Sequence, residues 1–175
     1  MAERFRQQNT DAGFSLIELI VTVIIMAVLA GSSILGVSQI LRTNVTTSAE
    51  KVATAFDQAR YENLYRDGNV TLQLIYENEH YYVVTRLEKE NAGIPVIEEL
   101  RREEIGDRRV DVLAISTGGV TVDVRTTPVT IAFYKSGGAL KAVGMMYRAI
   151  QIENASKRAE ITLVEHTGRC FLDVE

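Results

Sequence analysis

The stretch that decides the fold lies near the N-terminus, where a short polar segment ends in Gly13-Phe14-Ser15-Leu16-Ile17-Glu18. An apolar stretch without any charge follows from Leu19 to Leu41, which is 23 residues. About 20 apolar residues in a helix cross the hydrocarbon core of a bilayer, so Glu18 places one carboxylate at the end of a segment of membrane length. Placing an ionisable carboxyl group in the hydrocarbon region costs a few kcal/mol, so we expect Glu18 to have a partner of opposite charge. No basic residue lies one helical turn away on either side, so we expect the partner from another molecule, for which the α-amino group of a neighbouring copy is suitable.

This N-terminus resembles that of type IV prepilins and pseudopilins. The shared features are a glycine before an aromatic residue, a glutamate at fixed spacing and the apolar helix that follows. The resemblance implies that a prepilin peptidase cuts between Gly13 and Phe14 on the cytoplasmic side and methylates the new N-terminal nitrogen of Phe14. It also implies that Glu18 pairs with the N-terminal amine of an adjacent subunit. The implied partners are the peptidase, other pilin or pseudopilin subunits and a membrane platform protein; no cofactor is implied.

The chain departs from the family pattern in two respects, the lack of a proline in the apolar segment and a leader that is not strongly basic. Many members carry a proline in the middle of the apolar segment, where this chain has glycines and serines within residues 30–36. Acidic residues balance Arg4 and Arg6, and bases also follow Leu41, so counting Lys and Arg does not orient the segment. The cleavage motif alone implies a single pass of the cytoplasmic membrane with the leader inside and the head outside, followed by entry into an extracytoplasmic filament.

An ordinary secretory signal is the alternative interpretation of this N-terminus. Arg4 and Arg6 would be its charged region, residues 14–26 its apolar core and residues 28–30 its small-residue cleavage site. This interpretation leaves Glu18 unexplained. A mature chain that begins at Phe14 favours the prepilin interpretation, and one that begins at Gly31 favours the secretory signal.

Beyond the apolar stretch, the pattern predicts that the helix continues with one buried face. Apolar residues recur at spacings of three and four, which is typical of an amphipathic helix: Val37, Ile40, Leu41, Val45, Ala49, Val52, Phe56 and Ala59. The intervening residues, Arg42, Glu50, Lys51, Asp57 and Arg60, are expected to face solvent. Gly68 supplies a stop, because glycine suits the left-handed cap position. A helix from Phe14 to about Arg66 would be roughly 80 Å long.

The rest of the chain predicts antiparallel strands. Residues 70–76 and 81–85 flank a polar turn and predict a hairpin. Further β-rich segments, separated by turns, are residues 110–115, 120–124, 129–133, 145–152, 159–164 and 170–174. The mixed-charge segment 88–109 is expected to be mainly a solvated loop with at most one strand or short helix. The fold class is therefore α+β, a long helix packed on one or two antiparallel sheets. Its parts are a leader (1–13), a transmembrane or filament-core half-helix (14–41), an amphipathic half-helix (42–68) and a β-rich head (69–175).

A narrower resemblance, to the H-type minor pseudopilins of type II secretion and related minor pilins, comes from short motifs in the head. They are residues 59–62, 70–72, 129–133 with the following glycines, and Thr167-Gly168-Arg169 in the last hairpin. Some of these relatives bind DNA through a basic C-terminal surface, which would correspond to Arg169, Lys157 and Arg158. The simpler interpretation of Gly168 is a β-turn that requires a positive φ.

Charge and reactive residues give little support for DNA binding or catalysis. Residues 44–124 have fifteen acids and nine bases, and residues 125–175 have seven bases and five acids, a net charge of +2 that is too small for a nucleic-acid footprint. Cys170 is the only cysteine, so no intrachain disulfide forms, and we expect it to pack in a strand. His80 and His166 have no neighbours at metal-ligand spacing, and nothing orients a Cys170–His166 nucleophile pair.

The sequence therefore predicts a structural filament subunit rather than an enzyme. It does not assign the machine, which is a secretion system, a pilus or a competence apparatus. Two alternatives stay open: a DNA-binding minor pilin of a DNA-uptake system, and a membrane-anchored or secreted β-domain without a role in a filament.

Overall fold

A computed structural model describes residues 16–91 and 93–175, and the side chains of residues 28–43 lie outside this description. In the described part of the chain, one helix is followed by ten strands, which confirms the α+β class. The chain divides into two compact units, Met1–Val37 and Ser38–Glu175. Both sheets belong to the second unit.

Helix α1 spans Leu16–Tyr65, one residue short of the expected end. The predicted buried face is confirmed wherever its side chains are described, because five of its apolar residues are inaccessible to solvent: Val45, Ala49, Val52, Phe56 and Ala59. Glu50 on the opposite face is exposed. Val37, Ile40 and Leu41 belong to the part whose side chains are not described.

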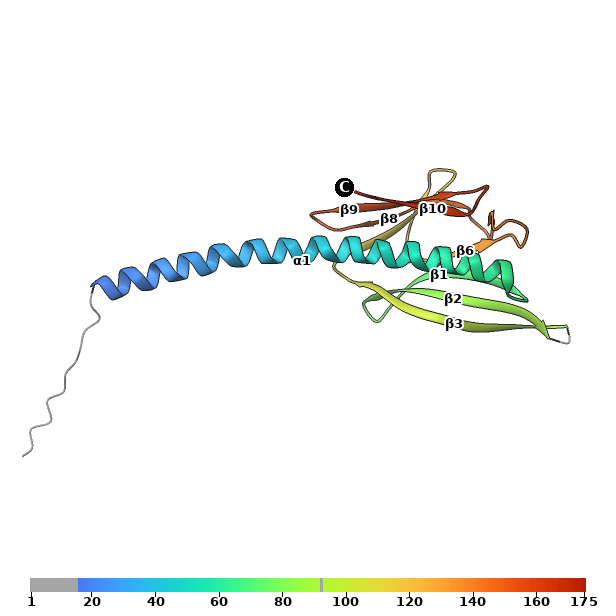
Figure 1. Ribbon diagram of the computed structural model, residues 1–175, viewed down its shortest axis with the longest axis horizontal. Coiled ribbons are helices and arrows are strands. Elements are labelled where there is room, and N and C mark those ends of the chain that lie inside the picture. The colour runs from blue at the N-terminus through green and yellow to red at the C-terminus, as the bar shows by residue number, and fades with distance from the viewer. Residues whose placement is uncertain (1–15, 92) are drawn as a thin grey trace, which may run out of the picture. The chain divides into compact units, whose positions relative to one another are not determined.

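The strands form two five-stranded antiparallel sheets (Figure 1). The first sheet, in the order β3-β2-β1-β6-β7, consists of β1 (Asn69–Glu77), β2 (His80–Asn91), β3 (Ile94–Asp107), β6 (Val129–Phe133) and β7 (Leu140–Lys141). The second, in the order β10-β9-β8-β4-β5, consists of β4 (Asp111–Ser116), β5 (Thr121–Asp123), β8 (Tyr147–Glu153), β9 (Arg158–Val164) and β10 (Arg169–Val174). Seven strands were predicted within two residues at each end, whereas β2 continues six residues beyond its predicted end, and β3 and the two-residue β7 were not predicted as separate strands.

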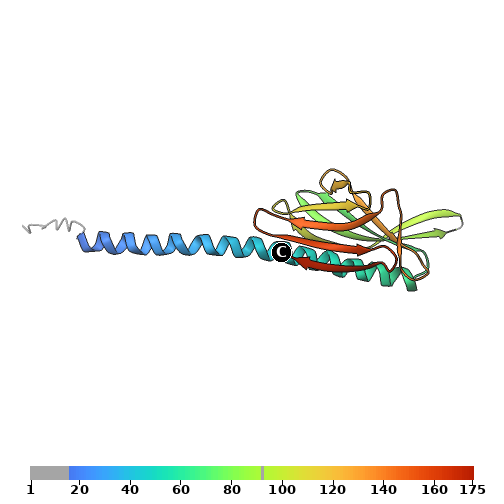
Figure 2. The same cartoon turned by 90° about the horizontal axis from the view of Figure 1, so that it is seen from above.

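The C-terminal half of α1 packs against both sheets along one side of the head, and all three share one core (Figures 1 and 2). Phe56 of the helix packs edge-to-face on Phe133 of β6, with 5.1 Å between the ring centroids. Leu72 of the first sheet and Ile161 of the second are in the same buried cluster. Figure 2 shows β10 lying alongside this part of α1, where Cys170 Sγ is 3.7 Å from the carbonyl of Ala53.

The predicted β1–β2 hairpin is confirmed, with a two-residue turn at Asn78 and Glu79. Both residues have positive φ, 51° and 66°, and Glu77 pairs with His80. Positive φ at both central residues is the requirement of a type I′ turn, whose twist matches that of the flanking strands.

The expectation for residues 88–109 was wrong in its main point, because the segment is mostly strand. β2 continues to Asn91, and β3 pairs with it from Ile94 to Asp107. β3 is an edge strand that is exposed on both faces over most of its length, so its sequence shows no alternation of apolar and polar residues. Charged residues on an edge strand discourage pairing with other chains. Arg101 joins this edge to α1 through Glu62, at 3.2 Å.

Within the described residues, no helix is long and apolar enough to span a membrane. The expected transmembrane character of residues 14–41 is therefore not shown by the structure.

The end of α1 is fixed by two residues. Asn63 is completely buried, and its Nδ2 donates to the carbonyl of Phe133 at 3.1 Å while its Oδ1 accepts from the Val70 amide at 2.8 Å. Gly68 has φ = 103°, as expected for the stop signal, and a Cβ there would lie 2.6 Å from the carbonyl oxygen of Glu88. Helix, β1 and β6 are thus joined at one point.

We predict that Asn63→Ala lowers the free energy of unfolding by about 2–4 kcal/mol, because it leaves the buried amide of Val70 and the carbonyl of Phe133 without partners. Urea denaturation of the purified full-length protein in detergent, followed by tyrosine fluorescence, measures the change. The exposed Asn91→Ala is the matched control and should change stability by less than about 0.5 kcal/mol. Equal stability of the two variants would contradict this role of Asn63.

Candidate functional site

Glu18 lies in the first turn of α1, and its side chain is exposed. Thr22, one turn later, donates a hydrogen bond from its hydroxyl to the backbone carbonyl of Glu18. A carboxylate in the first turn is stabilised by the helix dipole.

The residues around Glu18 form a continuous apolar surface on the helix. Between residues 16 and 27, nine large apolar side chains are exposed: Leu16, Ile17, Leu19, Ile20, Val21, Val23, Ile24, Ile25 and Met26. They surround the helix rather than lie on one face. Apolar surface of this extent is typical of a site that lipid or another protein covers.

Gly13 and Phe14, the expected cleavage and methylation residues, lie outside the described part of the chain. Residues 8–34, which include both of them and Glu18, match the family described as the prokaryotic N-terminal methylation motif. The N-terminus of the chain is thus of the type IV prepilin kind.

The match to the methylation motif ends before the globular head of the chain. No curated protein and no solved structure matches the chain significantly. The resemblance of the head to H-type minor pseudopilins is therefore not confirmed.

Gly168 is required by a close approach of two turns in the head. It has φ = 58°, and a Cβ there would lie 1.8 Å from the carbonyl oxygen of Gly138, in the turn that follows β6. The Gly168 amide donates to the carbonyl of Val164 at 2.8 Å. The two glycine turns also enclose the side chain of Arg60, whose Nε is buried, so Arg60 does not simply face solvent as expected. This packing accounts for the glycine of the Thr167-Gly168-Arg169 turn without any ligand.

The three basic residues expected on a DNA-binding surface are not gathered at one place. Arg169 pairs with Val164 at one end of the β9–β10 hairpin, and Arg158 lies at the other end of β9, about 20 Å away at 3.3 Å per residue. Arg158 is 3.9 Å from the carboxylates of both Glu153 and Glu160. Lys157 donates to the hydroxyl of Thr46 in α1 at 3.1 Å. The geometry offers no contiguous basic patch at these residues, and DNA binding stays an untested hypothesis.

Cys170 packs in β10 against α1, as the sequence predicted. Burial, with Asp57 as a smaller influence, raises the pKa of its thiol to about 11. A raised pKa keeps the group protonated and disfavours nucleophilic chemistry. His80 contacts Glu104 at 2.7 Å on the surface and His166 is exposed in a turn. Among the described residues, no group of His, Cys, Asp and Glu side chains has the arrangement of a metal site.

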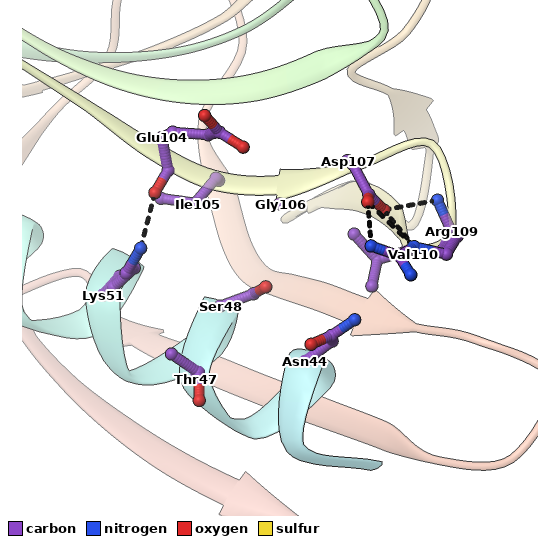
Figure 3. Close-up of a pocket in the computed structure, with 10 residues that line it drawn as sticks. All are labelled: Asn44, Thr47, Ser48, Lys51, Glu104, Ile105, Gly106, Asp107, Arg109 and Val110. Carbon is purple, nitrogen blue, oxygen red and sulfur yellow. Dashed lines mark hydrogen bonds and ion pairs between the residues drawn. The ribbon is translucent and has the colours of Figure 1, made fainter. Parts of the chain in front are cut away.

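The sequence analysis missed a polar pocket between α1 and the end of β3 (Figure 3). The helix contributes four polar residues that share one face by their spacing of three and four: Asn44, Thr47, Ser48 and Lys51. The strand side and the turn after it span residues 104–110. The available signal was this polar stripe beside the apolar stripe of α1, of which the sequence analysis considered only Lys51 and assigned it to solvent.

We predict that Gly168→Ala lowers the free energy of unfolding of the head by more than about 1–2 kcal/mol, which is the cost of the left-handed backbone alone. The additional cost, about 1–3 kcal/mol, comes from the collision with the carbonyl of Gly138. Gly137→Ala is the matched control, since Gly137 also has a positive φ, 87°, but a Cβ there meets nothing within 4 Å. Equal decreases in the free energy of unfolding of the two variants, measured by urea denaturation, would contradict a requirement for glycine at the contact between the two turns.

We predict that iodoacetamide alkylates Cys170 in the native protein at pH 8.5 at least about tenfold more slowly than in urea, because the raised pKa and burial limit the thiolate. Mass spectrometry over time measures both rates. His166→Ala should leave the native rate unchanged. A fast native reaction that depends on His166 would instead support the nucleophile pair.

Proposed function

We propose that this protein is a structural pilin or pseudopilin subunit that prepilin peptidase cleaves between Gly13 and Phe14. The peptidase methylates the nitrogen of Phe14, and the mature chain joins a filament through the N-terminal part of α1. The observation that carries this proposal is one carboxylate, Glu18, within a continuous exposed apolar surface and inside a matched methylation motif.

Before assembly, the apolar part of α1 is held in the cytoplasmic membrane, with residues 1–13 in the cytoplasm and the head outside. The exposed side chains of residues 16–27 support this step because water is an unfavourable environment for them. During assembly, the helices of other subunits replace lipid around these residues. A membrane platform protein is the proposed partner for this transfer.

Glu18 would set the axial position of one subunit against the next. A buried ion pair is stabilising only when the two charges meet with good geometry, and removing one partner costs about 3–5 kcal/mol. The amine of Phe14 in a neighbouring chain has this geometry at one offset only. A misplaced subunit would bury both charges without partners and would therefore be rejected.

The head is proposed to act as a binding and packing module without catalysis, in a minor pilin or a pseudopilin. A thiol that burial keeps protonated and the dispersed histidines support this proposal. The alternative of a DNA-binding minor pilin would require salt-sensitive DNA binding that charge reversal at Lys157, Arg158 and Arg169 abolishes.

We predict that Glu18→Ala is cleaved normally but enters filaments at least about tenfold less than the wild type. The neighbour's amine would be buried without a counter-charge, at a cost of about 3–5 kcal/mol. Quantitative immunoblotting of membrane and sheared-filament fractions measures incorporation. Glu50→Ala, which removes an exposed carboxylate from the same helix, is the control and should assemble normally.

Normal incorporation of Glu18→Ala would remove Glu18 from the mechanism. Equal behaviour of Glu18→Leu and the wild type in every fraction would favour a tethered β-domain without a role in a filament.

A further inference from the structure

The polar pocket between α1 and β3 has a volume of about 200 Å³ and is open to solvent. Small-molecule sites have volumes of about 300–1,000 Å³, so the pocket is better matched to a single side chain. Figure 3 shows Asn44, Thr47, Ser48 and Lys51 along α1, facing the strand segment that carries Glu104 and Asp107.

Ser48 carries a hydroxyl group at the edge of this open pocket. The residue is 2% exposed, and no hydrogen bond of its side chain is found among the described residues. Its Oγ lies on the strand side of the helix, because a Cβ at Gly106 would come within 3.2 Å of it (Figure 3). A ligand in the pocket can therefore accept a hydrogen bond from this hydroxyl.

The carboxylates near the pocket are already engaged. Both oxygens of Asp107 accept from Arg109 Nε, at 3.1 and 2.8 Å, and this contact holds the pKa of Asp107 below its usual range. Glu104 turns its carboxylate to His80, at 2.7 Å, and offers the pocket only its backbone carbonyl. The pocket therefore has little negative charge that is free to bind a cation.

The ammonium group of Lys51, in contrast, has spare capacity. It donates to the carbonyl of Glu104 at 2.8 Å, and its nearest carboxylate, of Glu103, is 4.0 Å away with both side chains about 40% exposed. An ion pair of that kind is worth about 0–1 kcal/mol. Because an ammonium group has three donors, Lys51 can bind a further acceptor while it keeps the Glu104 contact.

We propose that this pocket binds the carboxylate of an acidic side chain from the adjacent subunit of the filament. Ser48 and Lys51 donate to it, and Asn44 supplies an amide at the same opening. Charge complementarity selects a carboxylate, since the ammonium group of Lys51 has only one weak, exposed ion pair in the described part of the chain and can donate further. The neighbour is the source because Val45, the first buried residue among the described side chains of α1, marks the pocket's end of the head, next in sequence to the segment that other subunits would surround. This inference rests on the proposed function.

Binding is tested first with the processed full-length chain in detergent micelles. The probe is N-acetylglutamate N-methylamide, and its neutral glutamine analogue is the control ligand. We expect saturable NMR shifts at Ser48 and Lys51 with a Kd of millimolar order, and none with the glutamine analogue. Lys51→Met should weaken binding at least about tenfold. Lys135→Met should not, although Lys135 likewise donates to a backbone carbonyl, that of Arg66.

Ser48→Ala separates a binding role from a structural one. Removal of a hydroxyl that makes no hydrogen bond within the described chain should leave the thermal midpoint of the protein unchanged, while binding of the glutamate probe weakens several-fold. A hydroxyl with a purely structural role would instead lower the midpoint when removed. That result, or an absence of saturable binding in the wild type, would overturn the proposal.

Incorporation into filaments identifies the source of the carboxylate. Lys51→Met should be processed normally but incorporated several-fold less than Lys135→Met. If the probe binds and Lys51→Met assembles normally, the pocket takes free anions only, and the neighbour is excluded. If Glu18→Ala fails to assemble while Lys51→Met assembles, this inference alone fails. If the wild type itself never enters a filament, the proposed function fails and this inference with it.

Discussion

The contact on which the structure depends is the burial of one face of α1 against the two sheets. Val52 and Phe56 of the helix enter the core that both sheets share, so the helix covers part of each sheet. Burying a side chain such as Phe56 stabilises by about 1.5–3 kcal/mol. Asn63 then fixes the helix to β1 and β6 by hydrogen bonds that water cannot reach. The helix is therefore the central element of the head and not an appendage to it.

The first described residues of the same helix have exposed apolar side chains instead of buried ones. Residues 16–27 have no cover within the described chain, and Glu18 is the one charge among them. One part of α1 is thus buried by its own sheets, and its first described residues need another environment to cover them. In the proposed function, this environment is a membrane before processing and other subunits afterwards.

Much of the fold could be predicted because periodicity reports burial. The helix from Val45 to Ala59 and most strands bury one face in the core, so apolar residues recur along that face with the period of the element. β3 could not be predicted in this way, since an edge strand exposed on both faces has no pattern to show. Gly13, Phe14 and Glu18 could be proposed as site residues from the sequence alone, because a short motif contains them, and their roles stay predictions. The separation of Arg169 from Arg158 depends on how β9 and β10 pair, and the place of Ser48 beside β3 depends on a contact distant in sequence, so both needed the structure.

The most direct test of the account is the N-terminus of the mature protein. Intact-mass and peptide mass spectrometry of the chain, purified from membranes of cells with an active prepilin peptidase, measures where it begins. The account predicts a first residue of Phe14 carrying one methyl group on its nitrogen. A chain that keeps residues 1–13, or one that begins at Gly31, would contradict it.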